Sequence, residues 1–334
     1  EADAYDRTDE EMLAKCADAV ARGATEVCIQ GGIHPQRDHN DYHHILKTIK
    51  AVYPDLHIHA FSPEEMDHGH KKSGMPLTEY LQWLVDAGLG TMPGTAAEIL
   101  DDDVRNVLSP NKLKTDRWVE IVRAAHSIGL RSTSTLMYGH IESPEHIANH
   151  LDLLRGIQKD TGGFTEFVIL PFIHMESPIY LKGRARKGPT FREAILIHAI
   201  SRLVLHPLFK NIQASWTKLG HEGVRACLQA GVNDLGGTLM NETITRAAGA
   251  AHGQETSPEE MEEIIRSIGR SPRQRSTTYG EVTELQRQKS FGAVTMVEPT
   301  YTSAKKYERK QNRQKQELVR NELESEKLTS QDII

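Results

Sequence analysis

The sequence has no run of about eighteen apolar residues, which is what a helix needs to cross a bilayer. It also has no excess of basic residues, because the formal net charge of its 334 residues is −6. A basic excess is typical of proteins that bind nucleic acid or anionic membranes. The first residues, Glu1–Arg7, are acidic and contain no apolar signal region. These absences favour a cytoplasmic protein that binds neither nucleic acid nor membrane, and the missing initiator methionine indicates a trimmed or incomplete chain.

Cysteine is scarce, with only Cys16, Cys28 and Cys227 in the chain. Their spacing fits neither a zinc site nor a CxxC redox pair, and an odd, sparse count favours a reducing compartment. We expect all three to be small packing residues. The chain has 17 histidines but no HExxH motif. The sequence therefore predicts no metal site within this chain.

No GxGxxG sequence opens a helix, so a dinucleotide-binding fold lacks its main support. Short apolar runs alternate instead with longer helical patterns, which implies parallel strands joined by right-handed crossovers. This spacing favours an α/β fold of the (β/α) barrel type over an open sheet. The expected strands are Thr25–Gln30, His57–Phe61, Gly90–Met92, Arg131–Met137, Glu166–Leu170, Asn211–Ala214 and Gly231–Leu235. An eight-stranded barrel needs one more strand, and we expect it to precede residue 1.

Apolar residues between these strands repeat at helical spacing. The repeats predict helices over Leu77–Val85, Trp118–Ala125, Ile147–Leu154 and Leu196–Val204. Ser62, Ser143 and Ser257 each precede a Pro-Glu pair, the pattern of a capping serine followed by proline at the first helical position.

Two regions differ in composition. We expect residues 1–280 to form the barrel and residues 281–334 to form a charged tail. The tail is rich in Lys, Arg, Gln and Glu between Tyr301 and Lys327 and is expected to be helical or disordered.

Polar residues and glycines follow the carboxyl ends of the expected strands, where (β/α) barrels build their active sites. Gln30, Gly31 and Gly32 come first, and glycine lets the backbone approach a ligand closely. Other strand-end residues are His59, Ser62, Glu64, Glu98, Tyr138, His140, His174, Ser215, Trp216, Lys218, Asn233, Asp234, Gly236, Gly237 and Glu242. This set suits a polar substrate held by many hydrogen bonds.

Several long strings carry a resemblance to a known family. They are CIQGGIHP, HIHAFSPEEM, MPGTAAEIL, ILPFIHMESP, IQASWTKLG and GVNDLGGTLMNETITRAAGA. In this order, from about Ala4 to about Tyr279, they resemble the FO synthase family, in the subunit or C-terminal half that joins L-tyrosine to a ribityl-diaminouracil. Related enzymes of futalosine-dependent menaquinone synthesis share the outline.

The resemblance implies a radical S-adenosylmethionine barrel with a [4Fe–4S] cluster, whose usual ligands are cysteine thiolates. It implies cleavage of S-adenosylmethionine to a 5′-deoxyadenosyl radical that oxidises tyrosine. The 4-hydroxybenzyl group then adds to 5-amino-6-(D-ribitylamino)uracil, and a partner subunit or domain closes the deazaflavin ring in a second radical step.

The resemblance also implies residue roles. Gln30, Gly31 and Gly32 match the motif that holds the methionine end of S-adenosylmethionine, and Glu98 lies in the loop near its adenosyl group. The residues expected near the cofactor or the uracil are Asn233, Asp234, Gly236 and Gly237. Contacts to tyrosine or uracil are expected of His59, Tyr138, His140 and His174, with a structural role equally open for each.

One departure from the family is plain, because the chain contains no CxxxCxxC. Such a loop would lie just upstream of Glu1, so the chain is either a fragment or a protein without a cluster. We expect this chain alone to show no radical chemistry. Two alternatives stay open: an aminofutalosine or cyclic futalosine synthase, and a cluster-free binding subunit that pairs with the sister radical enzyme.

Overall fold

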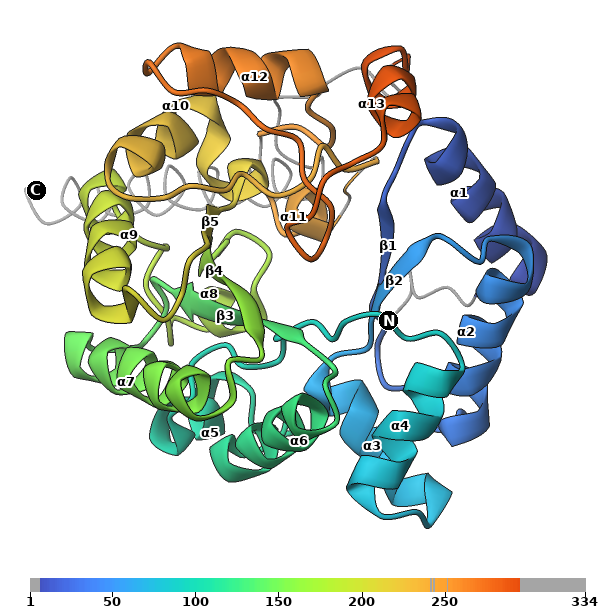
Figure 1. The fold of residues 1–334 in the computed structure, drawn as a ribbon. Helices are drawn as coiled ribbons and strands as arrows, with labels where there is room; N and C mark the ends of the chain where they lie inside the picture. The colour runs from blue at the N-terminus through green and yellow to red at the C-terminus, as the bar shows by residue number, and fades with distance from the viewer. Residues whose placement is uncertain (1–6, 241, 243, 251, 295–334) are drawn as a thin grey trace, which may run out of the picture.

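A computed structural model describes residues 7–240, 242, 244–250 and 252–294. Its strands are all parallel and follow one another in sequence order (Figure 1). Strand β1 (Glu26–Ile29) pairs with β2 (His57–Ala60). The second sheet has the order β3 (Ser132–Tyr138), β4 (Phe164–Pro171), β5 (Ile212–Ala214).

Isolated parallel bridges connect these sheets and extend them. Thr91 bridges to His59 of β2, and Met92 bridges to Ser132 of β3. Asp234 bridges to Gln213 of β5 at the other edge. Each expected strand therefore lies where the sequence predicts it, although Gly90–Met92 and Gly231–Leu235 are reduced to isolated bridges. This succession of parallel strands confirms the barrel-type α/β architecture.

Helices surround the strands and connect them (Figure 1). Those in the first half are α1 (Asp9–Ala21), α2 (His39–Val52), α3 (Pro63–Ser73), α4 (Leu77–Asp86), α5 (Asp102–Leu108) and α6 (Thr115–Ser127). Those that follow are α7 (Pro144–Thr161), α8 (Pro178–Leu181), α9 (Phe191–Leu205), α10 (Trp216–Gln229), α11 (Ile244–Ala247), α12 (Pro258–Arg266) and α13 (Glu284–Phe291).

The predicted capping serines begin three of these helices. Ser62, Ser143 and Ser257 each accept a hydrogen bond from the backbone three residues later, at the starts of α3, α7 and α12. A proline occupies the first helical position in all three, where its missing N–H leaves no hydrogen bond unmade.

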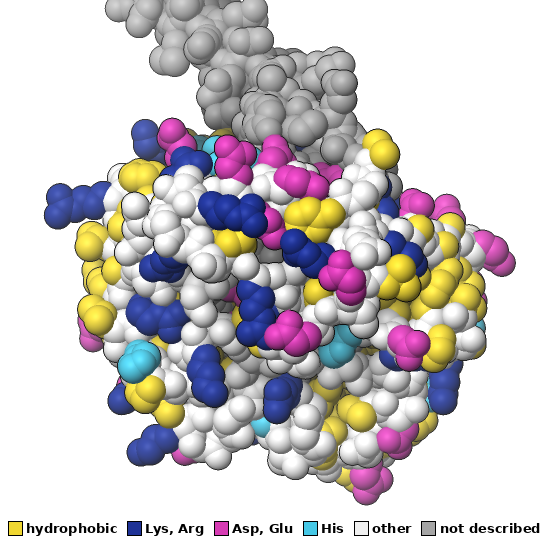
Figure 2. Space-filling view, turned by 45° about the horizontal axis from the view of Figure 1, so that its top comes forward, with side chains coloured by type: hydrophobic (Ala, Val, Ile, Leu, Met, Phe, Trp, Pro, Cys, Tyr) yellow, Lys and Arg dark blue, Asp and Glu magenta, His cyan; other side chains and the backbone are white. Residues whose placement is uncertain are grey.

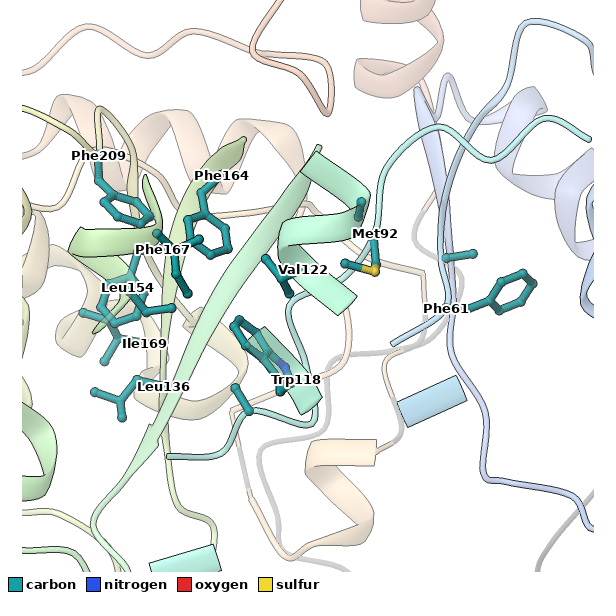
Figure 3. Packing of buried hydrophobic residues seen from close by; sticks show 14 of the residues in the cluster. Phe61, Met92, Trp118, Val122, Leu136, Leu154, Phe164, Phe167, Ile169 and Phe209 are labelled. Atoms are coloured by element: carbon teal, nitrogen blue, oxygen red, sulfur yellow. The ribbon is translucent and has the colours of Figure 1, made fainter. Parts of the chain in front are cut away.

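The core lies between the strands and the covering helices. Figure 3 shows Phe164, Phe167 and Phe209 gathered beside β4, and ring centroids of Phe164 and Phe209 lie 5.5 Å apart. Trp118 of α6 packs between the helix and the sheet and is fully buried. Burying each such side chain stabilises the fold by about 1.5–3 kcal/mol, so these rings help to fix α6 and α7 on the barrel.

Helix α9 presents apolar side chains on two sides. Ile197 and Leu205 face the core, whereas Leu196, Ile200 and Leu203 are exposed. The apolar repeat over Leu196–Val204, from which this helix was predicted, therefore lies mostly on the solvent-facing side of α9.

The cysteines only partly follow expectation. Cys16 and Cys227 are buried, as predicted, but Cys28 is exposed. The physical reason is that β1 has a strand neighbour on one side only within the described residues.

Residues 270–281 close the amino ends of the strands. Arg275 forms ion pairs with Asp234 (2.5 Å) and Glu166 (3.1 Å), and the Tyr279 hydroxyl donates to Glu166. Thr277 donates a hydrogen bond to Glu26, the first residue of β1. The barrel is thus sealed at this end by its own charged side chains.

Most of the expected tail lies outside the described residues, which end at residue 294 and include only α13. The division at residues 280 and 281 stays a prediction. Side chains of both charge signs are spread over the face in Figure 2. Within the described part of the chain, no helix is long and apolar enough to cross a membrane.

Candidate active site at the carboxyl ends of the strands

The turn after β1 is open on its ligand-facing side. Among the described residues, a Cβ built on Gly32 would meet nothing within 4 Å, and one on Gly31 would meet only Glu65, at 3.8 Å. Neither glycine has a left-handed φ. Since neither backbone conformation nor protein neighbours require glycine here, the free space suits a ligand that approaches the backbone closely.

Two side chains fix this turn from opposite sides. The Thr95 hydroxyl donates to the Gln30 side-chain oxygen (2.6 Å), which ties the turn to the loop after Met92. The Gly31 N–H donates to Oε1 of Glu65 (2.9 Å), which ties it to the start of α3. Sequence reasoning missed Glu65, although the Ser62-Pro63-Glu64-Glu65 pattern that marks the helix start contains it.

The loop carrying Glu98 is held tightly against β3. The Gly94 N–H donates to the Thr133 hydroxyl (2.8 Å), and the Thr135 hydroxyl donates to the Gly94 carbonyl (2.7 Å). A Cβ on Gly94 would lie 2.1 Å from the Thr133 carbonyl oxygen, so only glycine fits. Ala96 and Glu98 adopt φ of 59° and 43°, which is unusual for residues with side chains. This loop is therefore shaped by tertiary contacts against local preference.

The Glu98 carboxylate is occupied by cations of the protein. Lys112 donates a hydrogen bond to it, and the buried Arg105 lies 3.6 Å away. Arg105 also donates to the carbonyls of Ala97 and Leu113, so this group fastens the loop. The Glu98 backbone is bonded to β3 as well, because Met137 N–H donates to the Glu98 carbonyl (2.7 Å).

The last strand separates the predicted residues Asn233 and Asp234. Asn233 accepts from Arg202 of α9 (2.7 Å), on the helix side of the strand. Asp234 lies on the other side, where it pairs with Arg275 and accepts from the Gly236 N–H (2.6 Å). Both side chains therefore have protein partners in the structure.

The glycines that follow are nearer the open end. Gly236 has a φ of 73°, and a Cβ on it would lie 2.6 Å from the Gln213 amide nitrogen. The Gly237 carbonyl accepts from the indole N–H of Trp216 (2.9 Å), at the start of α10. The buried Trp216 thus holds the turn in place.

His59 and Tyr138 point in different directions from their strands. The His59 ring is bonded to the Thr91 hydroxyl (2.7 Å) inside the barrel, and burial together with the Arg275 charge lowers its pKa to about 4. Tyr138 lies one residue beyond Met137, so strand alternation turns its ring to the helix side with Leu136. Its hydroxyl is buried without a hydrogen-bond partner among the described residues. Tyr138 therefore does not join His59.

His140 is enclosed in its own loop. Its ring is bonded to the Met137 carbonyl (2.9 Å) and lies 3.0 Å from the Glu142 carboxylate, and burial lowers its pKa. His174 is only partly buried and stands against Tyr180, with ring centroids 4.5 Å apart. Of these two predicted contacts, His174 is the more accessible.

A lysine also reaches this end of the barrel. Lys218 donates to the Thr245 hydroxyl (2.8 Å), which in turn donates to Glu242 (3.1 Å). Burial lowers the pKa of Lys218, and the Glu242 charge opposes that effect. This chain of contacts joins α10 to the segment that follows the last strand.

Comparisons with known proteins assign this geometry to a family. Residues 1–154 match the model of the radical SAM superfamily, and residues 161–288 match the model of the CofH/MqnC C-terminal region. A 5-amino-6-(D-ribitylamino)uracil–L-tyrosine 4-hydroxyphenyl transferase of Methanothermobacter thermautotrophicus is 49% identical over 85% of this chain and 77% of its own length. The chain belongs to this transferase family.

Other relatives have a similar region within longer chains. An FO synthase of Nocardia farcinica is 50% identical over 84% of this chain but only 33% of its own length. This chain thus spans about a third of that relative. A crystal structure of methylornithine synthase (PylB) superposes with a TM-score of 0.58 at 18% identity and covers 81% of this chain and 75% of its own, which shows the fold alone.

The residues present fit one of the two groups that the radical SAM family implies. The Gly31–Gly32 turn leaves room for S-adenosylmethionine, because its Cβ directions are open among the described residues. A [4Fe–4S] cluster finds no fit here, since no three His, Cys, Asp or Glu residues of the described part lie close enough together to bind a metal.

Proposed function

We propose that this chain forms the cofactor-binding and substrate-binding walls of a transferase that couples the 4-hydroxybenzyl group of L-tyrosine to 5-amino-6-(D-ribitylamino)uracil. The open cradle of Gly31 and Gly32 at a strand end is the observation that carries the proposal. The substrates come from the names of relatives about half identical to this chain, including a second transferase from Methanopyrus kandleri.

In this family S-adenosylmethionine supplies a 5′-deoxyadenosyl radical, and that chemistry belongs to the cofactor. The chain's part is to bind and to orient. Gln30, Gly31 and Gly32 would hold the methionine end, and the Glu98 loop would lie beside the adenosyl group. The rigid attachment of that loop to Thr133 and Thr135 would keep the adenosyl position fixed.

We assign the substrate contacts to residues that follow the later strands, at the same carboxyl end of the barrel. Gly237 would allow close approach of the planar uracil, with Trp216 holding its turn. His174 offers an accessible ring for a hydrogen bond. We keep Asn233, Asp234, His59, Tyr138 and His140 as supports of this wall, because their polar atoms or rings are directed at the protein.

The ring-closing radical subunit or domain is the proposed partner. The support is that the FO synthase of Nocardia farcinica contains a region similar to this chain, and its polypeptide is about three times as long as that matching region.

The test uses the native polypeptide of this protein, treated with iron and sulfide under anaerobic conditions. Incubation with S-adenosylmethionine, tyrosine and the diaminouracil should release 5′-deoxyadenosine and form the coupled product. Turnover of futalosine-type precursors instead would make it a menaquinone-pathway enzyme. The printed chain alone, which contains no CxxxCxxC, should give no 5′-deoxyadenosine when supplied with iron and sulfide.

A further inference from the structure

Glu65 is a buried carboxylate whose partners are unusual. Its side chain belongs to a residue with 4% exposure, and burial raises its pKa. Among the described residues no lysine, arginine or histidine forms an ion pair with it. A buried carboxylate without a cation must be stabilised by hydrogen bonds, and those bonds show what the residue does.

Three donors reach the carboxylate. Two belong to Ser62, whose N–H (2.8 Å) and hydroxyl (2.6 Å) both donate to Oε2. The first of these bonds, together with the Glu65 N–H that donates to the Ser62 hydroxyl (3.4 Å), forms the capping box of α3, as Glu260 and Ser257 do for α12. The third donor is Gly31 N–H, 2.9 Å from Oε1 and 34 residues away in sequence. That bond has no part in capping the helix.

The bond to Gly31 fixes the direction of a whole peptide group. A trans peptide is planar, and its N–H and C=O point in opposite directions. Anchoring the Gly31 N–H on Glu65 therefore turns the Gln30 carbonyl away from α3. The Gln30 side chain is fixed independently by Thr95. Without Glu65, two consecutive glycines would leave this peptide free to rotate.

We propose that Glu65 is the positioning residue of the cofactor turn. It holds the Gln30–Gly31 peptide so that its carbonyl is a fixed acceptor beside the open space at Gly31 and Gly32. This inference rests on the proposed function, because it takes the ligand in that space to be S-adenosylmethionine.

The test compares Glu65→Gln with two matched variants in the native polypeptide, treated anaerobically with iron and sulfide. Glu260→Gln alters the equivalent capping carboxylate of α12, which accepts from the Ser257 N–H (2.9 Å). Glu11→Gln does the same at α1, where the carboxylate accepts from the Thr8 N–H (3.1 Å). Readouts are the dissociation constant of S-adenosylmethionine and amide hydrogen exchange in a peptide spanning residues 27–34.

For Glu65→Gln we expect binding weakened by about tenfold or more, which is the scale of a lost hydrogen bond to a charged group. We also expect faster exchange in residues 27–34, and neither change in the two matched variants. Glu65→Asp, which keeps the charge but shortens the reach, should behave like Glu65→Gln and serves if the latter does not fold.

Two results would overturn the inference while leaving the proposed function intact. One is unchanged binding by Glu65→Gln; the other is weakened binding without faster exchange, because Glu65 would then contact the ligand directly. Failure of the unaltered protein to bind S-adenosylmethionine would instead remove the proposed function and the inference together.

Discussion

At the amino ends of the strands, Arg275 lies inside the barrel and forms ion pairs with the carboxylates of Glu166 and Asp234. At the carboxyl ends, a Cβ on Gly32 would meet no atom of the described residues within 4 Å, and one on Gly31 would meet only Glu65, at 3.8 Å. One end is thus closed by the chain itself, and the other leaves open the space that we propose for a ligand. With a ligand there, stability and binding would be assigned to opposite ends of the same strands, as is usual for barrels.

Arg275→Ala should have the largest effect. Removing the guanidinium leaves Glu166 and Asp234 buried without a cation, which costs about 3–5 kcal/mol of unfolding free energy. Urea denaturation followed by circular dichroism measures it. Arg273→Ala is the matched variant, because its pair with Glu281 is exposed. Equal losses in the two variants would mean that the amino end does not stabilise the barrel.

Gly32→Val should affect binding and spare stability. The added side chain enters open space, so the unfolding free energy should change by no more than about 0.5 kcal/mol, as at most surface sites. It should fill the ligand position and weaken S-adenosylmethionine binding by about tenfold or more, or about 1.4 kcal/mol. Calorimetric titration measures this. Gly156→Val, on exposed α7 with an equally open Cβ direction, should bind normally. Normal binding by Gly32→Val would contradict a ligand at this turn.

Acid should destabilise the protein through His59, which lies between the two ends. Its pKa is about 4 in the folded chain and near 6.5 when unfolded. Between these values the unfolded state binds more protons, so stability is lost as pH falls from about 6.5 to about 4. One such histidine contributes a slope of up to about 1.4 kcal/mol per pH unit. His59→Asn should flatten the profile of urea midpoint against pH, and the exposed His44→Asn should not. Parallel profiles for His59→Asn and the unaltered chain would mean that His59 is not buried.

Trp216→Phe should have the smallest effect. The ring remains, but the hydrogen bond to the Gly237 carbonyl is lost, which costs about 0.5–1.5 kcal/mol. If the Gly236–Gly237 turn contributes to ligand binding, KM for the diaminouracil should rise. Expressed as a free energy, that rise should exceed the loss of unfolding free energy. A loss of stability alone would assign this turn to the scaffold.

Much of the fold could be predicted from local sequence. Apolar runs predicted the positions of all the strands, and Ser62, Ser143 and Ser257 predicted three helix starts. The direction of single side chains could not be predicted as well. Leu196 and Leu203 repeat at helical spacing, yet they are exposed because Ile197 and Leu205 supply the face of α9 that packs on the barrel.

The candidate site divides in the same way. Gln30, Gly31 and Gly32 were identifiable because two glycines directly after a strand indicate, from the sequence alone, that the backbone can approach a ligand closely. Glu98 and Asp234 were identifiable as strand-end carboxylates, but Lys112, Arg105 and Arg275 already bind them. Those partners lie between 7 and 41 residues away in the chain, and no local pattern links them.

By itself the sequence determined the order of parallel strands, the helix starts and the glycine turns, because each depends on the conformational preferences of a few adjacent residues. Only the tertiary structure decided which carboxylates are free, which face of α9 is buried, and that Glu65 anchors Gly31. These features depend on contacts between segments that are distant in sequence. A buried charge is costly unless it is paired or hydrogen-bonded, and only the fold brings its partner close.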